Sequence, residues 1–129
     1  MPERPLSPHL SVYRWGYTMS LSILHRAAGI ALGVALIGLT GWLLAAAGGP
    51  APYAQAVLVL HAWPSRVLCV LALIALCFHF CNGVRHLAWD VGWGFERREA
   101  RRSAALMLVV AAVAAVVCVV AMLRGASGP

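Results

Sequence analysis

Two histidines, an asparagine and a glycine recur at helical spacing in the second apolar stretch of this chain. His79, Asn82, Gly83 and His86 stand at i, i+3, i+4 and i+7, which places them on one face of a helix. At a rise of 1.5 Å per residue, His79 lies about 10 Å deeper along the helix axis than His86. An imidazole at that depth is either hydrogen-bonded to a neighbouring helix or a metal ligand, and inside a bilayer it suits haem iron. We expect His79 to be the only histidine at such depth, so a bis-histidine haem would take its second ligand from another chain.

A second group of reactive side chains opens the first apolar stretch. Ser22, Arg26, Gly29 and Gly33 fall on one helical face, so the hydroxyl and the guanidinium are predicted to point into one crevice. The glycines permit the close approach of another helix or of a flat cofactor. An arginine at a helix entrance either reaches lipid headgroups or binds an anionic or carbonyl-bearing ligand. His25 beside it favours the ligand.

The elements that position these residues are predicted to be membrane-spanning helices. Apolar residues make up 62% of the 129-residue chain and charged residues 11%, which excludes an ordinary water-soluble domain. Three charge-free runs of 21, 18 and 21 residues occupy positions 27–47, 67–84 and 103–123. A bilayer core of about 30 Å needs roughly 20 helical residues, so each run fits one crossing. The sequence therefore predicts an all-α membrane protein of three transmembrane helices.

The chain divides into an arm, a membrane domain and a tail. We predict a polar, extended N-terminal arm over residues 1–20, a three-helix transmembrane domain over 21–123 and a short tail over 124–129. The three long helices are expected at about 20–47, 65–89 and 103–123, with a short surface helix over 53–62 and a charged loop before the third long helix.

The positive charges bracket the apolar runs. The net charge of +6 comes from ten arginines, and their placement beside the runs argues against a nucleic-acid partner. More of these arginines belong to the arm and to the charged loop before the third long helix than to the opposite end of the spans. The positive-inside bias therefore predicts a cytoplasmic N-terminus, or a matrix one in a mitochondrion.

Three sequence blocks resemble one known family. They are RPLSPHLSVYR at Arg4–Arg14, SILHRAAG at Ser22–Gly29 and HFCNGVRHLAWD at His79–Asp90. In this order and spacing they are similar to the cytochrome b subunit of succinate dehydrogenase, the larger haem-binding membrane anchor of complex II. The resemblance covers residues 4 to about 123, and outside the blocks it consists only of hydrophobicity.

The resemblance implies roles for individual residues. Ser22 and Arg26 match the family's ubiquinone-binding serine and arginine, and His79 matches its axial haem ligand. His25 and Arg26 match residues near the haem propionates, and His86 is expected in the same vicinity. No residue of this chain is expected to be catalytic toward succinate.

The resemblance also implies an assembly. One haem b would be shared with a second membrane-anchor subunit that supplies the other ligand, and ubiquinone would be the substrate. An iron–sulfur subunit and a flavoprotein subunit would dock on the side of the arm. The expected location is a bacterial inner membrane, with the mitochondrial inner membrane as the alternative. Two other functions stay open: the anchor of a quinol:fumarate reductase, and a haem-free structural membrane subunit.

Overall fold

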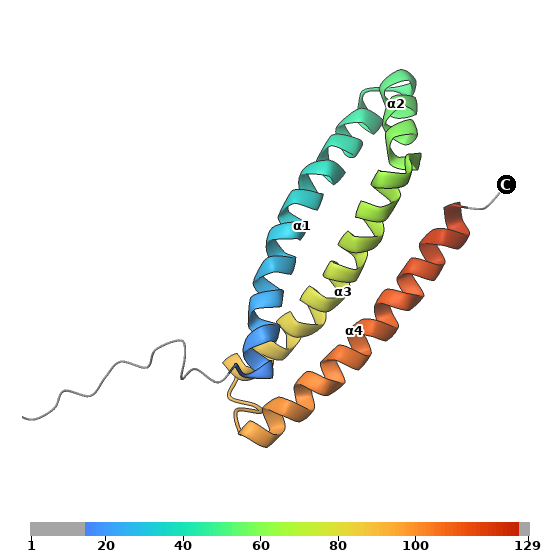
Figure 1. Cartoon of the computed structure of the whole chain (residues 1–129). Coiled ribbons are helices and arrows are strands. Elements are labelled where there is room, and N and C mark those ends of the chain that lie inside the picture. The colour runs from blue at the N-terminus through green and yellow to red at the C-terminus, as the bar shows by residue number, and fades with distance from the viewer. Residues whose placement is uncertain (1–14, 127–129) are drawn as a thin grey trace, which may run out of the picture.

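A computed structural model describes residues 15–126, and these form four helices and no strand. The helices are α1 (Tyr17–Ala47), α2 (Pro50–His61), α3 (Trp63–Asp90) and α4 (Arg97–Ala126). Figure 1 shows the three long helices side by side, with α2 at the end where α1 turns back toward α3. The polyproline-like backbone predicted for the start of the arm lies outside the described residues.

Helices α1, α3 and α4 are each long and apolar enough to cross a membrane. They contain 31, 28 and 30 residues, and at 1.5 Å per residue the shortest is roughly 40 Å long. Each helix therefore exceeds a hydrocarbon core of about 30 Å and extends into the interfacial layers. The predicted fold class, an all-α protein with three membrane spans, is confirmed.

Glycine and proline set the two breaks at the far end of the bundle. Gly49 adopts a φ of +105° between α1 and α2, a conformation that L side chains rarely adopt, and Pro50 begins α2 with a φ suited to a first helical position. Between α2 and α3, Ala62 is extended (ψ 140°). In a continuous helix the ring of Pro64 would collide with the carbonyl of Leu60, so the chain must break there. The short helix predicted between the first two spans is confirmed and begins three residues earlier than expected, and its position at the membrane surface stays a prediction.

The charged segment before the third span is helical, and the prediction of a loop there is wrong from Arg97 onward. Helix α4 begins at Arg97, six residues before the predicted start at Ser103. Arginine, glutamate and alanine are all good helix formers, and the segment contains neither proline nor glycine. The loop itself is short and turns at Gly92 and Gly94, both with positive φ. Hydrophobicity located the membrane span, but the helix continues into the aqueous layer.

The tightest packing joins α3 to α4. Small side chains on one face of α4 let the two helices approach closely, and around them a buried cluster forms with Leu21 of α1 and, from α3, Phe78 and Cys81. The buried residues of that α4 face recur at helical spacing and are Ala104, Met107, Ala111 and Ala115. The third span is therefore a packing helix as well as a lipid-facing one.

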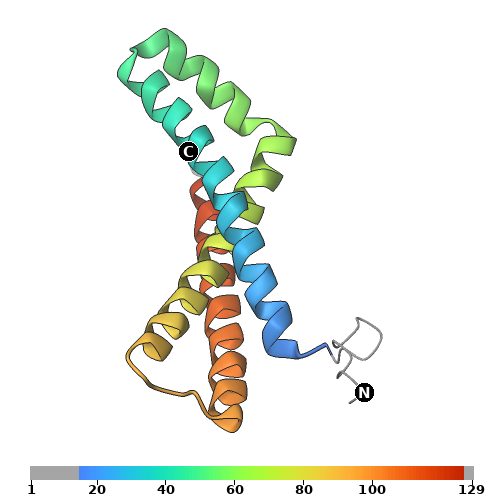
Figure 2. The same ribbon diagram turned by 90° about the vertical axis from the view of Figure 1, so that its left-hand side faces the viewer.

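Helix α1 packs on α3 near its N-terminal end and is exposed along most of its length. Its buried residues are Leu21 and Ala28, whereas large apolar side chains farther along, such as Ile30 and Ile37, are each 73% exposed. Figure 2 shows the start of α1 and the α3–α4 loop at one end of the molecule, and the α1–α2 connection at the other. The polar residues of interest all belong to the first of these ends, here called the arm-side end.

Candidate cofactor and ligand site

Three histidine rings from α1 and α3 form a contiguous ladder at the arm-side end. The rings of His25 and His79 stack face to face with centroids 4.0 Å apart and planes 7° from parallel. His86 lies 5.3 Å from His25, and its ring meets the indole of Trp89 edge to face at 5.0 Å. The ladder joins the two sequence blocks, one on each helix, that the spacing analysis picked out separately.

The depth prediction for the histidines is wrong in one respect. His79 is not alone, because His25 lies beside it at the same level. The two rings still cannot be opposite axial ligands of one iron. The in-plane lone pairs of two stacked rings point sideways and do not converge from opposite sides on one point, so the two rings would not hold one metal ion between them.

The ring of His79 is held by a hydrogen bond to the neighbouring helix. Its Nδ1 lies 3.2 Å from the backbone carbonyl oxygen of His25. A carbonyl only accepts, so Nδ1 carries the proton and Nε2 of the neutral ring keeps its lone pair. Within residues 15–126 Nε2 has no hydrogen-bond partner, and the side chain is only half-buried. Metal-binding histidines usually have this arrangement, with the other ring nitrogen donating to a carbonyl.

Gly29 of α1 provides the space that the His79 ring occupies. A Cβ at position 29 would lie 3.0 Å from Cε1 and 3.5 Å from Nδ1 of that ring. A Cβ on Gly33, one turn farther along, would meet nothing within 4 Å. Of the two glycines predicted to permit close approach, Gly29 has that role within the described residues.

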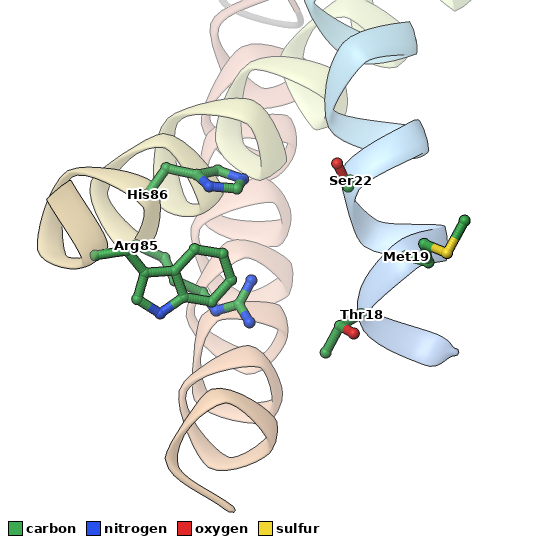
Figure 3. Close-up of a pocket in the computed structure, with 6 residues that line it drawn as sticks. Thr18, Met19, Ser22, Arg85 and His86 are labelled. Carbon is green, nitrogen blue, oxygen red and sulfur yellow. The ribbon is translucent and has the colours of Figure 1, made fainter. Parts of the chain in front are cut away.

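A cavity of about 240 Å³ opens next to the ladder, between the arm-side ends of α1 and α3. Its lining is hydroxyl-bearing on the α1 side and cationic or aromatic on the α3 side (Figure 3), from Thr18, Met19, Ser22, Arg85, His86 and Trp89. Ser22 therefore lies on the cavity wall, as the prediction of a crevice at this position expected, and its quinone role stays a prediction. Arg26 does not line this cavity: it is exposed, and its Nε contacts the carbonyl of Ser22 on its own helix at 3.5 Å.

Arg26 lies outside the cavity because of the way α1 is rotated about its own axis against α3. The residues of α1 that meet α3 are centred on Leu21, His25 and Ala28, and successive residues on a helix are turned by about 100°. Arg26 is thus turned away from His25 and toward the side of α1 that the rest of this chain leaves uncovered.

The sequence analysis missed the role of Arg85. Its side chain is 7% exposed and joins α3 to α4: Nε donates to Ser103 Oγ at 3.1 Å and Nη2 to the Ala100 carbonyl at 3.0 Å. On its own helix, Nη1 reaches Asn82 Oδ1 at 3.4 Å, and the guanidinium lies 4.0 Å from the centre of the Trp89 ring. The available signal was the spacing of Asn82, Arg85 and Trp89 (i, i+3, i+7), which places all three on one helical face.

Three apolar spans, with a histidine ladder and a cavity at one end of the bundle, define a multi-span helical membrane protein. Residues 1–118 match the family of succinate dehydrogenase/fumarate reductase transmembrane subunits, and the chain belongs to that family.

Its relatives include bacterial and mitochondrial proteins. The chain is 37% identical over 106 residues to the succinate dehydrogenase cytochrome b556 subunit of Paracoccus denitrificans, covering 82% of each. It is 40% identical over 97 residues to the cytochrome b556 subunit of Rickettsia typhi, covering 74% of each. Against the human mitochondrial cytochrome b560 subunit it is 39% identical over 112 residues, which is 84% of this chain and 65% of the human protein.

Proposed function

We propose that this chain is the cytochrome b membrane anchor of a succinate dehydrogenase and that His79 is its axial ligand to haem b. The observation that carries the proposal is the hydrogen bond from His79 Nδ1 to the His25 carbonyl, in the space left by Gly29. It fixes the tautomer and orientation of the ring and leaves Nε2 available. Among the described residues no group of three or more histidine, cysteine or acidic side chains is suited to a metal ion, so a metal here would depend on an additional donor.

The surrounding residues fit a haem group. When bound, haem supplies a one-electron carrier whose potential depends on its ligands and surroundings. His25 Nδ1 is buried and has no hydrogen-bond partner within residues 15–126, so it can donate to an acceptor such as a propionate. His86, the third ring of the ladder, lies closer to the arm-side end of α3. Because the two stacked rings cannot serve opposite faces of one iron, the second ligand would come from the partner anchor subunit, and one haem would be shared.

Ubiquinone is proposed to bind at the entrance of α1. The Ser22 hydroxyl, which lines the cavity, would donate a hydrogen bond to one quinone oxygen. Arg26 would stabilise negative charge on the ligand from the outer side of α1, where its guanidinium is exposed. Ser22 and Arg26 are one turn apart on the same side of α1, with Arg26 turned farther from α3, so the ligand would lie along that side and be completed by another subunit.

The assembly follows the same reasoning. Flavin and iron–sulfur chemistry would reside on a flavoprotein and an iron–sulfur subunit docked on the arm side, with no catalytic residue in this chain. The excess of arginine at that end supports a cytoplasmic N-terminus in a bacterial inner membrane. The relatives above are succinate dehydrogenase subunits by name, which supports that direction over a quinol:fumarate reductase.

The decisive test of the haem assignment is His79→Ala, purified as the whole complex. The dithionite-reduced minus oxidised spectrum should lose its b-type Soret band. The matched control is His61→Ala, which removes an exposed histidine of α2 and should leave the band intact. An unchanged spectrum in His79→Ala would support the haem-free structural subunit instead.

The quinone assignment is tested with Ser22→Ala and Arg26→Leu. Both should lower quinone reduction by roughly 10- to 100-fold, because each variant removes one or two hydrogen bonds to the quinone. Succinate oxidation by an artificial acceptor should stay normal. Equal loss of both activities would show that the variants damage the complex generally, and the assignment would then be dropped.

A further inference from the structure

The guanidinium of Arg85 is buried without a counter-charge. Its hydrogen-bond acceptors in residues 15–126 are a hydroxyl, a carbonyl and an amide oxygen, from Ser103, Ala100 and Asn82, and all of them are neutral. The indole of Trp89 adds a favourable but weak cation–π contact. A buried charge is expensive unless it is paired, so the full positive charge of Arg85 calls for a negative partner.

Unused donors next to this charge indicate the chemistry of the partner. A guanidinium carries five N–H groups, and three of them are engaged, which leaves one on each terminal nitrogen. Asn82 is fully buried, and its Nδ2 has no hydrogen-bond partner in the described part of the chain. Arg85 lines the neighbouring cavity and Asn82 does not, so the two remaining N–H groups of Arg85 are the ones that point to a missing acceptor group, and its charge makes that group an anionic one.

The cavity beside Arg85 has the size and position for such a group. It holds about 240 Å³, several times the roughly 30 Å³ that one water occupies in the liquid, and the hydroxyl-bearing residues Thr18 and Ser22 line its opposite wall. Figure 3 shows the Arg85 side chain reaching from α3 toward the α1 residues across this space. The cavity lies at the arm-side ends of α1 and α3, which are longer than a bilayer's hydrocarbon core and so would reach the interfacial layer, where lipid phosphates lie.

We propose that the α3 side of this cavity is an oxyanion site with Arg85 as its recognition residue, next to the α1 side, where Ser22 is proposed to meet the quinone. The ligand group is a carboxylate or a phosphate, which the planar guanidinium binds through its two remaining N–H groups. Two sources have this chemistry: a phospholipid headgroup and a haem propionate, the second of which rests on the proposed function. The exposed Arg26 does not line this cavity and is not part of the site.

The test uses the whole complex with two variants of Arg85 and one control. Arg85→Gln removes the charge, and Arg85→Lys keeps the charge while losing the planar fork. Ser103→Ala is the matched control, because it removes one α4 acceptor and leaves the charge in place. For the lipid source, delipidated complex is titrated with phosphatidylglycerol, or with the corresponding diacylglycerol that lacks phosphate, and binding is counted by native mass spectrometry. For the haem source, the midpoint potential of the b-type absorbance is titrated.

If the oxyanion belongs to a lipid, Arg85→Gln weakens phosphatidylglycerol binding at least tenfold, and Arg85→Lys weakens it less, because the charge stays while the planar fork is lost. Diacylglycerol binding and the Ser103→Ala variant stay near wild type. If it belongs to haem, Arg85→Gln lowers the midpoint potential, because an unpaired propionate favours ferric iron, and Arg85→Lys restores most of the shift. The proposal is overturned if Arg85→Gln matches wild type in both measurements. It is also overturned if Ser103→Ala loses as much as Arg85→Gln, which would mean that the α3–α4 connection alone matters. A wild-type complex without b-type absorbance would defeat the proposed function, and the phosphatidylglycerol titration would then decide whether Arg85 binds an oxyanion.

Discussion

Gly29→Ala tests whether the close approach of α1 to His79 positions a haem ligand. The new Cβ would lie 3.0 Å from Cε1 of His79, whereas carbon atoms in contact prefer about 3.5–4.0 Å. The ring must therefore move by roughly 0.5 Å or more away from α1. Its Nδ1 is already 3.2 Å from the His25 carbonyl, so this displacement exceeds the limit for a useful hydrogen bond.

The expected effect on stability is small and the effect on haem is large. Losing the hydrogen bond costs about 0.5–1.5 kcal/mol, and an off-rotamer ring costs a similar amount. The better helix propensity of alanine returns about 1 kcal/mol, so the complex should still assemble. The ligand loses the contact that fixes its orientation, and disruptions of this kind lower metal affinity about 10- to 100-fold.

The assay is the haem content per purified complex, together with the position of the reduced Soret band. Gly33→Ala is the matched control, since the same substitution one turn along α1 meets nothing within 4 Å. Gly29→Ala should show substoichiometric or spectrally shifted haem, and Gly33→Ala should resemble wild type. Indistinguishable spectra and haem content for the two variants would refute the positioning argument.

Three further predictions concern the scaffold. Ala111→Leu should destabilise the α3–α4 interface by about 1–3 kcal/mol through overpacking, whereas Ala112→Leu on the exposed side of α4 should not. Thermal melting in detergent compares the two variants, and equal melting midpoints would contradict the packing described. Gly49→Ala should lower the stability of the fold by about 1–3 kcal/mol, because alanine is strained at the positive φ of this position. Gly41→Ala is the unstrained control in the same melting assay, and a midpoint for Gly49→Ala no lower than that of the control would contradict the expected strain. A periplasmically active reporter should be active when fused after Arg124, because the arginine distribution places that end outside; activity only of an N-terminal fusion would reverse the orientation.

Much of the fold could be predicted from the sequence, because a membrane span has a strict requirement that shows in composition. Charge-free runs of about 20 residues have few alternatives to helices in lipid, and Pro64 and the Gly49–Pro50 pair mark breaks without reference to any partner. The helix boundaries at the aqueous side were harder to predict from the sequence. The start of α4 at Arg97 follows from helix propensity, which hydrophobicity does not report.

The candidate site was only partly predictable, for a geometric reason. Spacing places residues on one face of their own helix, and this correctly grouped His79 with His86 and assigned Ser22 to an inward-facing position. It cannot say how two helices are rotated relative to each other. That rotation stacks His25 on His79 and turns Arg26 away.

The sequence by itself determined the class of the protein and the number of its spans, and it supplied the candidate residues for a cofactor site, because these depend on local composition and on the 3.6-residue helical period. The tertiary structure decided which of those residues meet. The approach of α1 at Gly29 holds the His79 ring, and the packing of α4 on α3 buries Arg85 against neutral acceptors. Contacts between helices depend on their relative rotation and depth, which are set by side-chain packing along whole interfaces and are encoded in no single stretch of the chain.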